Sequence, residues 1–224
     1  MPQQWKEANV IILMLHNNGY KKDIKNFTPT SLLSNIYKLF CKEMIDILES
    51  VLDSNKPKEQ AGFRRSFSTI DHIHSINQLN EKCLEHNIPF SMAFMNYEKA
   101  FDSVKTHHSV LEALQEQGIN SYYIKLIRDI HRDNCTTVCL HKNSNKIKIK
   151  KGVRQEDIVS PKLFIAYLEK FFRIININGE ELNHLRFADD IILIAYAIKD
   201  SKVMLQELDN ASRTYTLKVN IIQR

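Results

Sequence analysis

The spacing of hydrophobic residues changes several times along this 224-residue chain between a helical and a strand-like repeat. Apolar residues that recur every three or four positions predict an amphipathic helix, because one helical face then carries all of them. Such spacing predicts helices over residues 31–52, 68–86, 105–117, 121–133, 160–172 and 200–215. In the second helix Ser68 or Thr69 is the expected cap, and the side chains expected to face inward are Ile70, Ile73, Ile76, Leu79 and Leu84.

Short apolar runs between these helices predict strands. The runs cover residues 10–15, 89–97, 136–142, 146–153 and 182–195, and the last is expected to form two strands bent at residues 188–190. The Asn18-Gly19 pair in the polar segment 16–23 predicts a tight turn. Because the order of strands and helices does not require parallel strands, the predicted fold class is α+β and not a doubly wound sheet.

Composition places the chain among globular proteins. Hydrophobic residues make up 43% and charged residues 25%, which excludes disorder over most of the length. No apolar run approaches the ~20 residues that cross a bilayer, so we expect no membrane segment and no signal peptide. The net charge of +5 suits a polyanionic partner, as it does many unrelated functions. Four scattered cysteines are typical of reduced thiols, and we expect an intracellular protein of the cytoplasm or nucleus.

The most informative chemical feature is the adjacent carboxylate pair Asp189-Asp190 between two apolar runs. Like charges side by side repel, so a fold that keeps them together needs a balancing cation. Mg²⁺ takes carboxylate oxygens readily, and two such ions can clamp the reacting oxygens of a phosphoryl transfer. The alternative is an ordinary hairpin turn with solvated aspartates. Metal chemistry of this kind needs a third carboxylate from another strand, and the run 90–102 offers a location for it.

Five blocks of the sequence resemble, in order, the motifs of LINE-type (non-LTR) retrotransposon reverse transcriptases. The blocks are DIKNFTPTSLLSNIYKLF (23–40), EQAGFRRSFSTIDHI (59–73), FMNYEKAFDSV (94–104), GVRQEDIVSPKLF (152–164) and HLRFADDIILIA (184–195). The resemblance covers nearly the whole chain. It implies the fingers and palm of a right-hand polymerase, with an antiparallel palm sheet and packed helices. Residues 1–88 would be fingers-like and residues 89–224 palm-like, with the thumb missing from the 224 residues.

The resemblance also implies a reaction and its partners. Members of the family polymerise DNA on an RNA template from a DNA primer and deoxynucleoside triphosphates, using two Mg²⁺ ions held by palm aspartates. Asp189 matches the metal-ligating member of the catalytic pair and Asp190 the supporting charge. The first acidic position of the palm is occupied here by Asn96.

Four further residues match positions near the nucleotide or template in this family. Phe101 matches the ring that crowds the nucleotide 2′-carbon, Arg154 and Gln155 match the next block, and Arg64 matches a fingers position. Without the resemblance, Phe101 would be read as a core residue, Arg154 and Gln155 as part of a polar loop, and Arg64 as a surface arginine. Asp102 matches a flanking carboxylate, which we expect to point elsewhere.

The departures from the family pattern fall on the chemistry. Asn96 replaces the palm aspartate, and a neutral amide binds Mg²⁺ more weakly than a carboxylate. Glu156 replaces a glycine and adds a negative charge where a triphosphate should lie, and Thr28 replaces a phosphate-binding arginine. These departures predict an inactive copy. The alternative is a relic without catalysis that still binds nucleic acid through the basic stretch 146–151 and Arg154.

Overall fold

The computed structural model describes residues 1–14, 27–104, 107–139, 144–149, 151–175, 183–215 and 217–222. After the 3-10 turn η1 (Gln3–Trp5), the helices are α1 (Asn35–Ser54), α2 (Thr69–Glu85), α3 (Ala100–Ser103), α4 (His107–Glu116), α5 (Ser121–His131), α6 (Ser160–Ile175) and α7 (Ile198–Thr214). The strands are β1 (Glu7–Met14), β2 (Phe27–Leu32), β3 (Ser91–Tyr97), β4 (Cys135–Val138), β5 (Ile147–Lys148), β6 (His184–Phe187), β7 (Asp190–Ala195) and β8 (Val219–Ile222).

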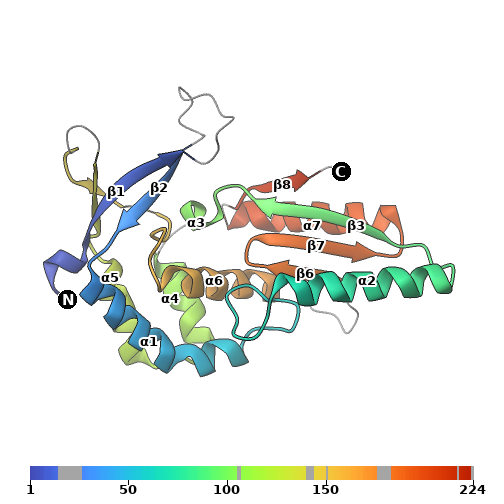
Figure 1. Ribbon diagram of the computed structural model, residues 1–224, viewed down its shortest axis with the longest axis horizontal. Coiled ribbons are helices and arrows are strands. Elements are labelled where there is room, and N and C mark those ends of the chain that lie inside the picture. The colour runs from blue at the N-terminus through green and yellow to red at the C-terminus, as the bar shows by residue number, and fades with distance from the viewer. Residues whose placement is uncertain are drawn as a thin grey trace.

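The strands form two separate sheets, which lie at opposite ends of the molecule (Figure 1). The first sheet has the order β2-β1-β4-β5, in which only the β1–β4 pair is parallel. The second has the order β6-β7-β3-β8 and is antiparallel throughout. This mixture of helices and mainly antiparallel strands confirms the α+β class. Strands β4 and β5 join the N-terminal strands in the first sheet, and the division of the chain at residue 88 stays a prediction.

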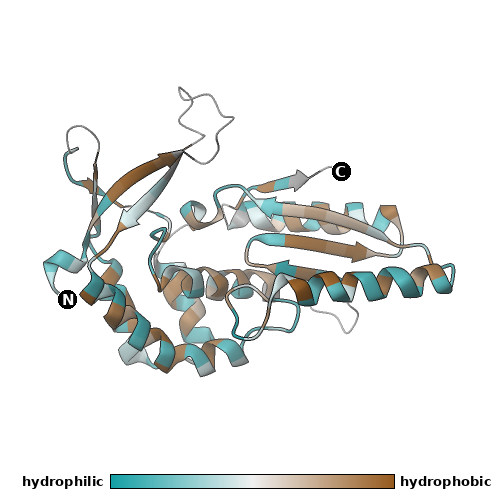
Figure 2. Ribbon diagram, in the orientation of Figure 1, coloured by the Kyte–Doolittle hydropathy of each residue, from teal (hydrophilic) through white to brown (hydrophobic). Residues whose placement is uncertain are grey.

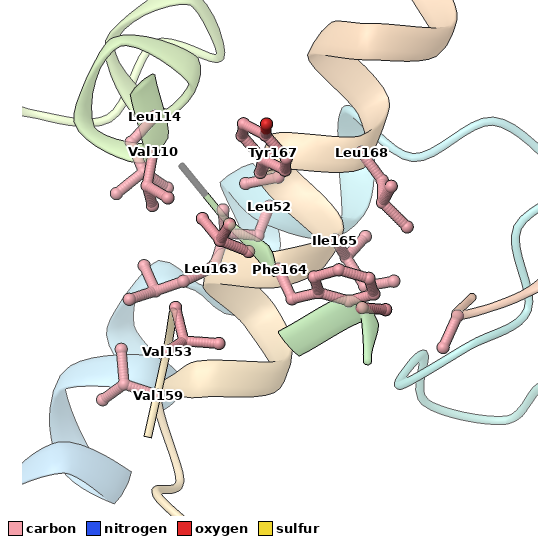
Figure 3. Close-up of a cluster of buried hydrophobic side chains, with 14 of the residues drawn as sticks. Leu52, Val110, Leu114, Val153, Val159, Leu163, Phe164, Ile165, Tyr167 and Leu168 are labelled. Carbon is pink, nitrogen blue, oxygen red and sulfur yellow. The ribbon is translucent and has the colours of Figure 1, made fainter. Parts of the chain in front are cut away.

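Helix α6 is the centre of the hydrophobic core. Its side chains are buried on every face, as expected of a helix that is apolar all round. Figure 3 shows its neighbours, which come from α1, α4 and the segment before α6: Leu52, Val110, Leu114, Val153 and Val159. Within the described residues, no helix is both long and apolar enough to cross a membrane.

The second sheet has one face on α6 and α7 and the other partly covered by α2. On the first face, the Tyr97 hydroxyl lies 3.2 Å from Ser212 Oγ of α7, and Arg186 pairs with Glu169 of α6. Leu185 alternates with Arg186 and lies with α2 residues around a small pocket, so α2 packs on the opposite face. Figure 2 shows that α2 is largely polar, whereas β7 is apolar along most of its length.

Most predicted elements are confirmed, and two boundaries are wrong. The first helix begins at Asn35 and not at residue 31, because residues 27–32 form β2 and pair with β1. Pro29 is tolerated there because β2 is an edge strand. The predicted strand 146–153 is reduced to two residues in β5. The strand β8 and the short helix α3 were not predicted. The predicted turn at residues 16–23 lies outside the described residues.

The inward face predicted for the second helix is only partly correct, because Ile76 and Leu79 are half-buried beside the second sheet. Ser68 caps α2 in a capping box with Asp71, as expected. However, Ile70 and Leu84 are both about 70% exposed (71% and 70%), and Ile73 is exposed as well. The pockets between α2 and the second sheet are lined by Ile76 and Leu79 but not by Ile70 or Leu84, so α2 buries a narrower stripe than its apolar pattern suggests.

Candidate active site

The carboxylate pair lies at the turn of the β6–β7 hairpin. Phe187 pairs with Asp190, so Ala188 and Asp189 form a two-residue turn. Ala188 has a φ of 58°, a left-handed conformation that costs a non-glycine residue about 1 kcal/mol or more. Burial raises the pKa of the half-buried Asp189 carboxyl, and the neighbouring Asp190 carboxylate adds to this rise. The sequence therefore predicted both the hairpin and the position of its bend correctly.

Asn96 lies beside this turn on the neighbouring strand. The last β3–β7 pair is Met95 with Ile191, and one further step of the antiparallel register places Asn96 next to Asp190. Met95 and Ile191 are buried in the core, so Asn96 and Asp190 both lie on the other face of the sheet. The side-chain Oδ1 of Asn96 is buried and has no hydrogen-bond partner among the described residues.

These three side chains have the chemistry of a divalent-cation site. Two carboxylates and an amide oxygen are hard oxygen ligands of the kind that Mg²⁺ accepts. The unsatisfied Asn96 Oδ1 fits this reading, because a buried polar atom normally has a partner. Within the described part of the chain, no group of three or more His, Cys, Asp and Glu residues is arranged to hold a metal. The candidate site thus depends on the amide of Asn96 as its third ligand.

Asp102 does not join this group. Its Oδ1 accepts a hydrogen bond from Gln155 Nε2 at 3.2 Å, which ties the α3 segment to the block before α6. Gly152 strengthens this connection, because its main-chain N–H donates to the Val104 carbonyl and a Cβ on it would lie 3.0 Å from Asp102 Cα. Two of the sequence blocks are therefore in direct contact.

Phe101 and Gln155 line a pocket of about 470 Å³ together with Phe63 and Glu156. The Phe101 ring stacks on Phe164 with centroids 4.4 Å apart and meets the edge of Phe63 at 6.4 Å. One side of Phe101 thus packs on the core, while the residue also borders the pocket. Glu156 is exposed with a φ of 64°, the left-handed conformation in which glycine is favoured.

Arg154 is buried, so its guanidinium is not placed as that of an exposed phosphate ligand would be. It is 5% exposed, and its two terminal nitrogens donate to the main-chain carbonyls of Trp5 and Lys6 at 3.1 and 2.8 Å. It therefore anchors the N-terminal segment, although it also borders the pocket. Arg64 donates to the Pro57 carbonyl at 3.1 Å and lies 4.2 Å from the centre of the Phe67 ring. Phe63, and not Arg64, lines the pocket from this stretch.

One residue that sequence reasoning missed holds the hairpin turn. Gln60 is fully buried, and its Oε1 accepts hydrogen bonds from the main-chain nitrogens of Ala188 and Gly62 at 3.0 and 2.8 Å. Gly62 packs so closely that a Cβ on it would overlap the main-chain nitrogen of Ala188. No local pattern signals such a contact, because Gln60 and Ala188 are 128 residues apart.

We expect Gly62→Ala to lower the free energy of unfolding by about 2 kcal/mol, because the added methyl meets main-chain atoms that must shift. Chemical denaturation measures this loss, and the NMR signal of the Ala188 amide reports the displaced turn. Gly118→Ala is the matched control, since a Cβ there meets nothing within 4 Å and only its φ of +80° is unfavourable. The control should cost ~1 kcal/mol and leave the Ala188 signal unchanged. Equal effects of both variants on that signal would contradict the close packing.

The raised pKa of Asp189 predicts a pH-dependent effect of Asp189→Asn. In the metal-free chain the fold favours the protonated carboxyl, so the stability that this group contributes is present at acid pH. It is lost as pH rises through the raised pKa. We therefore expect Asp189→Asn to be more stable than the unmodified chain at pH 7 and equally stable near pH 3. Urea unfolding at both pH values checks this, and a less stable variant at pH 7 would refute it.

Comparison with known sequences agrees with this arrangement. The sequence model of the family described as reverse transcriptase (RNA-dependent DNA polymerase) matches residues 20–221. The retrovirus-related Pol polyprotein from the type-1 retrotransposable element R2 of Popillia japonica is 26% identical over 92% of this chain. The RNA-directed DNA polymerase from the mobile element jockey of Drosophila melanogaster is 24% identical over 86%. The chain spans 29% and 21% of the lengths of these two relatives.

Solved structures with a similar fold include two telomerases. The telomerase of Candida albicans, solved with a TWJ fragment of telomeric RNA, superposes with a TM-score of 0.70 over 100% of this chain and 43% of its own, at 12% identity. An apo telomerase of Candida tropicalis, truncated from its C-terminal domain, gives 0.68 over 99% and 51%, at 14% identity. The fold is that of a right-hand polymerase. With the family match over most of its length and mobile-element polymerases among its relatives, the chain belongs to the reverse transcriptase family, in its non-LTR retrotransposon branch.

Proposed function

We propose that this chain is the fingers and palm of an RNA-directed DNA polymerase of a non-LTR element, in a copy that polymerises poorly or not at all. The observation that carries the proposal is the placement of Asn96 and Asp190 on one face, beside the turn that bears Asp189. Asp189 and Asn96 would hold Mg²⁺, with Asp190 as the supporting charge. A bound Mg²⁺ pair supplies the charge stabilisation for nucleotidyl transfer.

The pocket lined by Phe101 and Gln155 supports a role for these two residues at the incoming deoxynucleotide. The flat Phe101 ring borders the pocket from a rigid position on Phe164, where it can exclude a substrate by steric overlap. The Gln155 amide is held by Asp102 at the same border. The buried position of Arg154 supports an indirect part for that residue, through the N-terminal segment that it anchors. Arg64 would act through the loop that presents Phe63.

Two features support the proposal of weak or absent catalysis. The third metal ligand is a neutral amide, so the site has one unit of negative charge less than a site of three carboxylates. The Glu156 side chain lines the pocket with a negative charge that repels a triphosphate. The same two features favour the alternative function, a relic that binds nucleic acid without catalysis. The exposed Lys148 and Lys151 can contact phosphates, whereas Lys146 is paired with Glu7 at 2.6 Å.

The RNA template, DNA primer and deoxynucleoside triphosphates are the partners that this proposal requires. All four cysteines are free thiols, which supports a reducing intracellular compartment.

Primer extension and duplex binding together test the proposal. The chain is given an RNA template, a DNA primer, deoxynucleotides and Mg²⁺, with Asp189→Ala as control, and binding of the same duplex is measured by fluorescence anisotropy at two salt concentrations. Trace extension that disappears in Asp189→Ala supports the polymerase. Salt-dependent binding without extension supports the relic. If the chain neither extends the primer nor binds the duplex, both functions are wrong.

A further inference from the structure

A short segment upstream of α2 runs along the edge of the second sheet. We call residues 59–62 the strap. The main-chain nitrogen of Arg186 donates to the Glu59 carbonyl at 2.8 Å, and that of Ala61 donates to the Arg186 carbonyl at 3.0 Å. Gln60 and Arg186 form a parallel bridge. The strap therefore adds to β6 on the side away from β7, just before the chain enters the Ala188–Asp189 turn.

The strap reaches the turn itself through the Gln60 side chain. Both lone pairs of Oε1 are used, one by the main-chain nitrogen of Ala188 and one by that of Gly62. Ala188 is 5% exposed, so water does not readily replace this acceptor for its N–H. Because Ala188 holds a left-handed φ of 58°, its peptide group needs surrounding contacts to keep its orientation.

The backbone of the strap also lies directly against the turn. A Cβ on Gly62 would overlap the Ala188 nitrogen and lie 3.0 Å from the Ala188 Cα. The strap thus supplies a main-chain surface against the turn and a side-chain oxygen that accepts the Ala188 N–H. These contacts fix the orientation of the Ala188 peptide group, and Asp189 directly follows Ala188 in the turn.

We propose that Gln60 is a positioning residue that fixes the Ala188–Asp189 turn and so determines where the Asp189 carboxylate is presented. Gln60 contacts neither the reacting atoms nor the candidate metal ligands themselves, and it acts through the main chain of Ala188. The inference rests on the proposed function only in giving Asp189 its role as a metal ligand. It connects a fingers segment to the catalytic turn of the palm, so a change in one is transmitted to the other.

The test compares three variants of the full chain without metal or substrate. Gln60→Met keeps the length of the side chain and removes the acceptor, Gln60→Glu keeps an acceptor oxygen, and Gln117→Met is the matched control. Gln117 is also buried, at 6% exposure, but donates to Ala166 in α6, away from the turn. Hydrogen exchange of the Ala188 amide is measured by NMR, together with the global stability of each variant.

In Gln60→Met we expect exchange of the Ala188 amide to become about tenfold faster or more, beyond any increase that the change in global stability explains. Gln60→Glu should restore most of the protection, and Gln117→Met should leave the exchange of the Ala188 amide unchanged. A merely structural role of Gln60 predicts lower stability with no selective effect on the turn, which would overturn the proposal.

A measurement on the unmodified chain keeps the proposal testable if Gln60→Met does not fold. The hydrogen bond should give a scalar coupling between the Ala188 amide nitrogen and the Gln60 side-chain carbonyl carbon, and absence of this coupling overturns the proposal. None of these readouts depends on polymerisation. Failure to bind divalent ions would therefore count against the proposed function, and unaltered turn dynamics in Gln60→Met would count against the role of Gln60.

Discussion

Asn96→Asp should increase the rate of RNA-templated primer extension on the order of 10³-fold over the unmodified chain. The substitution adds the third carboxylate to the face that already carries Asp190, beside the turn that bears Asp189. Its charge would strengthen binding of a divalent cation where negative charge develops in the transition state. The two side chains have nearly the same shape, and the Asn96 Oδ1 is already buried without a partner, so little rearrangement is needed. The initial rate of extension at saturating Mg²⁺ measures the gain.

Asn220→Asp is the matched control for charge alone. Asn220 pairs directly with Asn96 across β3 and β8, so the control adds the same charge one strand further from the hairpin. An equal gain from both variants would show that general negative charge is responsible, and not a ligand at position 96. If Asn96→Asp binds template–primer but extends it no faster than the unmodified chain, the amide is not what limits catalysis. Adding Glu156→Gly should raise the rate further, because it removes a carboxylate from the pocket.

Glu169→Gln should lower the free energy of unfolding by about 3–5 kcal/mol, the largest loss of stability that we expect from a single change. The Glu169 carboxylate is 3.1 Å from the Arg186 guanidinium, and both side chains are almost completely buried. Removing the negative charge leaves a buried cation without its carboxylate partner, although the Phe172 ring still lies 4.0 Å from the guanidinium carbon. Arg186 lies in β6 two residues before the Ala188–Asp189 turn, so the damage should also reach the candidate site.

Urea or thermal unfolding of the purified variant measures this effect. Asp46→Asn is the control, because Asp46 pairs with Arg65 at 2.8 Å on the surface, with side chains 41% and 69% exposed. An exposed pair contributes only ~0–1 kcal/mol, so the control should be close to the unmodified chain. If Glu169→Gln is as mild as Asp46→Asn, the buried pair is not holding α6 to the second sheet.

Local spacing predicted the elements that carry their own signal. The β6–β7 hairpin with its bend at residues 188–190 was found because two apolar runs flank an acidic pair, and α6 was found from Ser160-Pro161 and the apolar residues that follow. The α2 cap at Ser68 was found for the same reason. Each of these features depends on residues within a few positions of one another.

Elements that depend on distant partners were missed or misjudged. Residues 31 and 32 were assigned to the following helix, yet they belong to β2 because β1 offers them main-chain hydrogen bonds. β8 is four residues long and forms on the free edge of β3. The apolar residues Ile70 and Leu84 of α2 stay exposed because they lie off the stripe of that helix that faces the second sheet. Periodicity shows that a face is apolar, but it does not show which surface will cover it.

In the candidate site, too, some features could be read from the sequence and others depended on the tertiary structure. The sequence alone showed the adjacent Asp189-Asp190 pair in one block and an asparagine at position 96, in place of an expected aspartate, in another. Three facts depend on packing between segments more than 90 residues apart: the register that sets Asn96 beside Asp190, the Gln60 contact with Ala188, and the use of Arg154 by the Trp5 and Lys6 carbonyls. These contacts form only where distant segments pack together. Residue types alone are compatible with many such packings, so the sequence did not predict which contacts form.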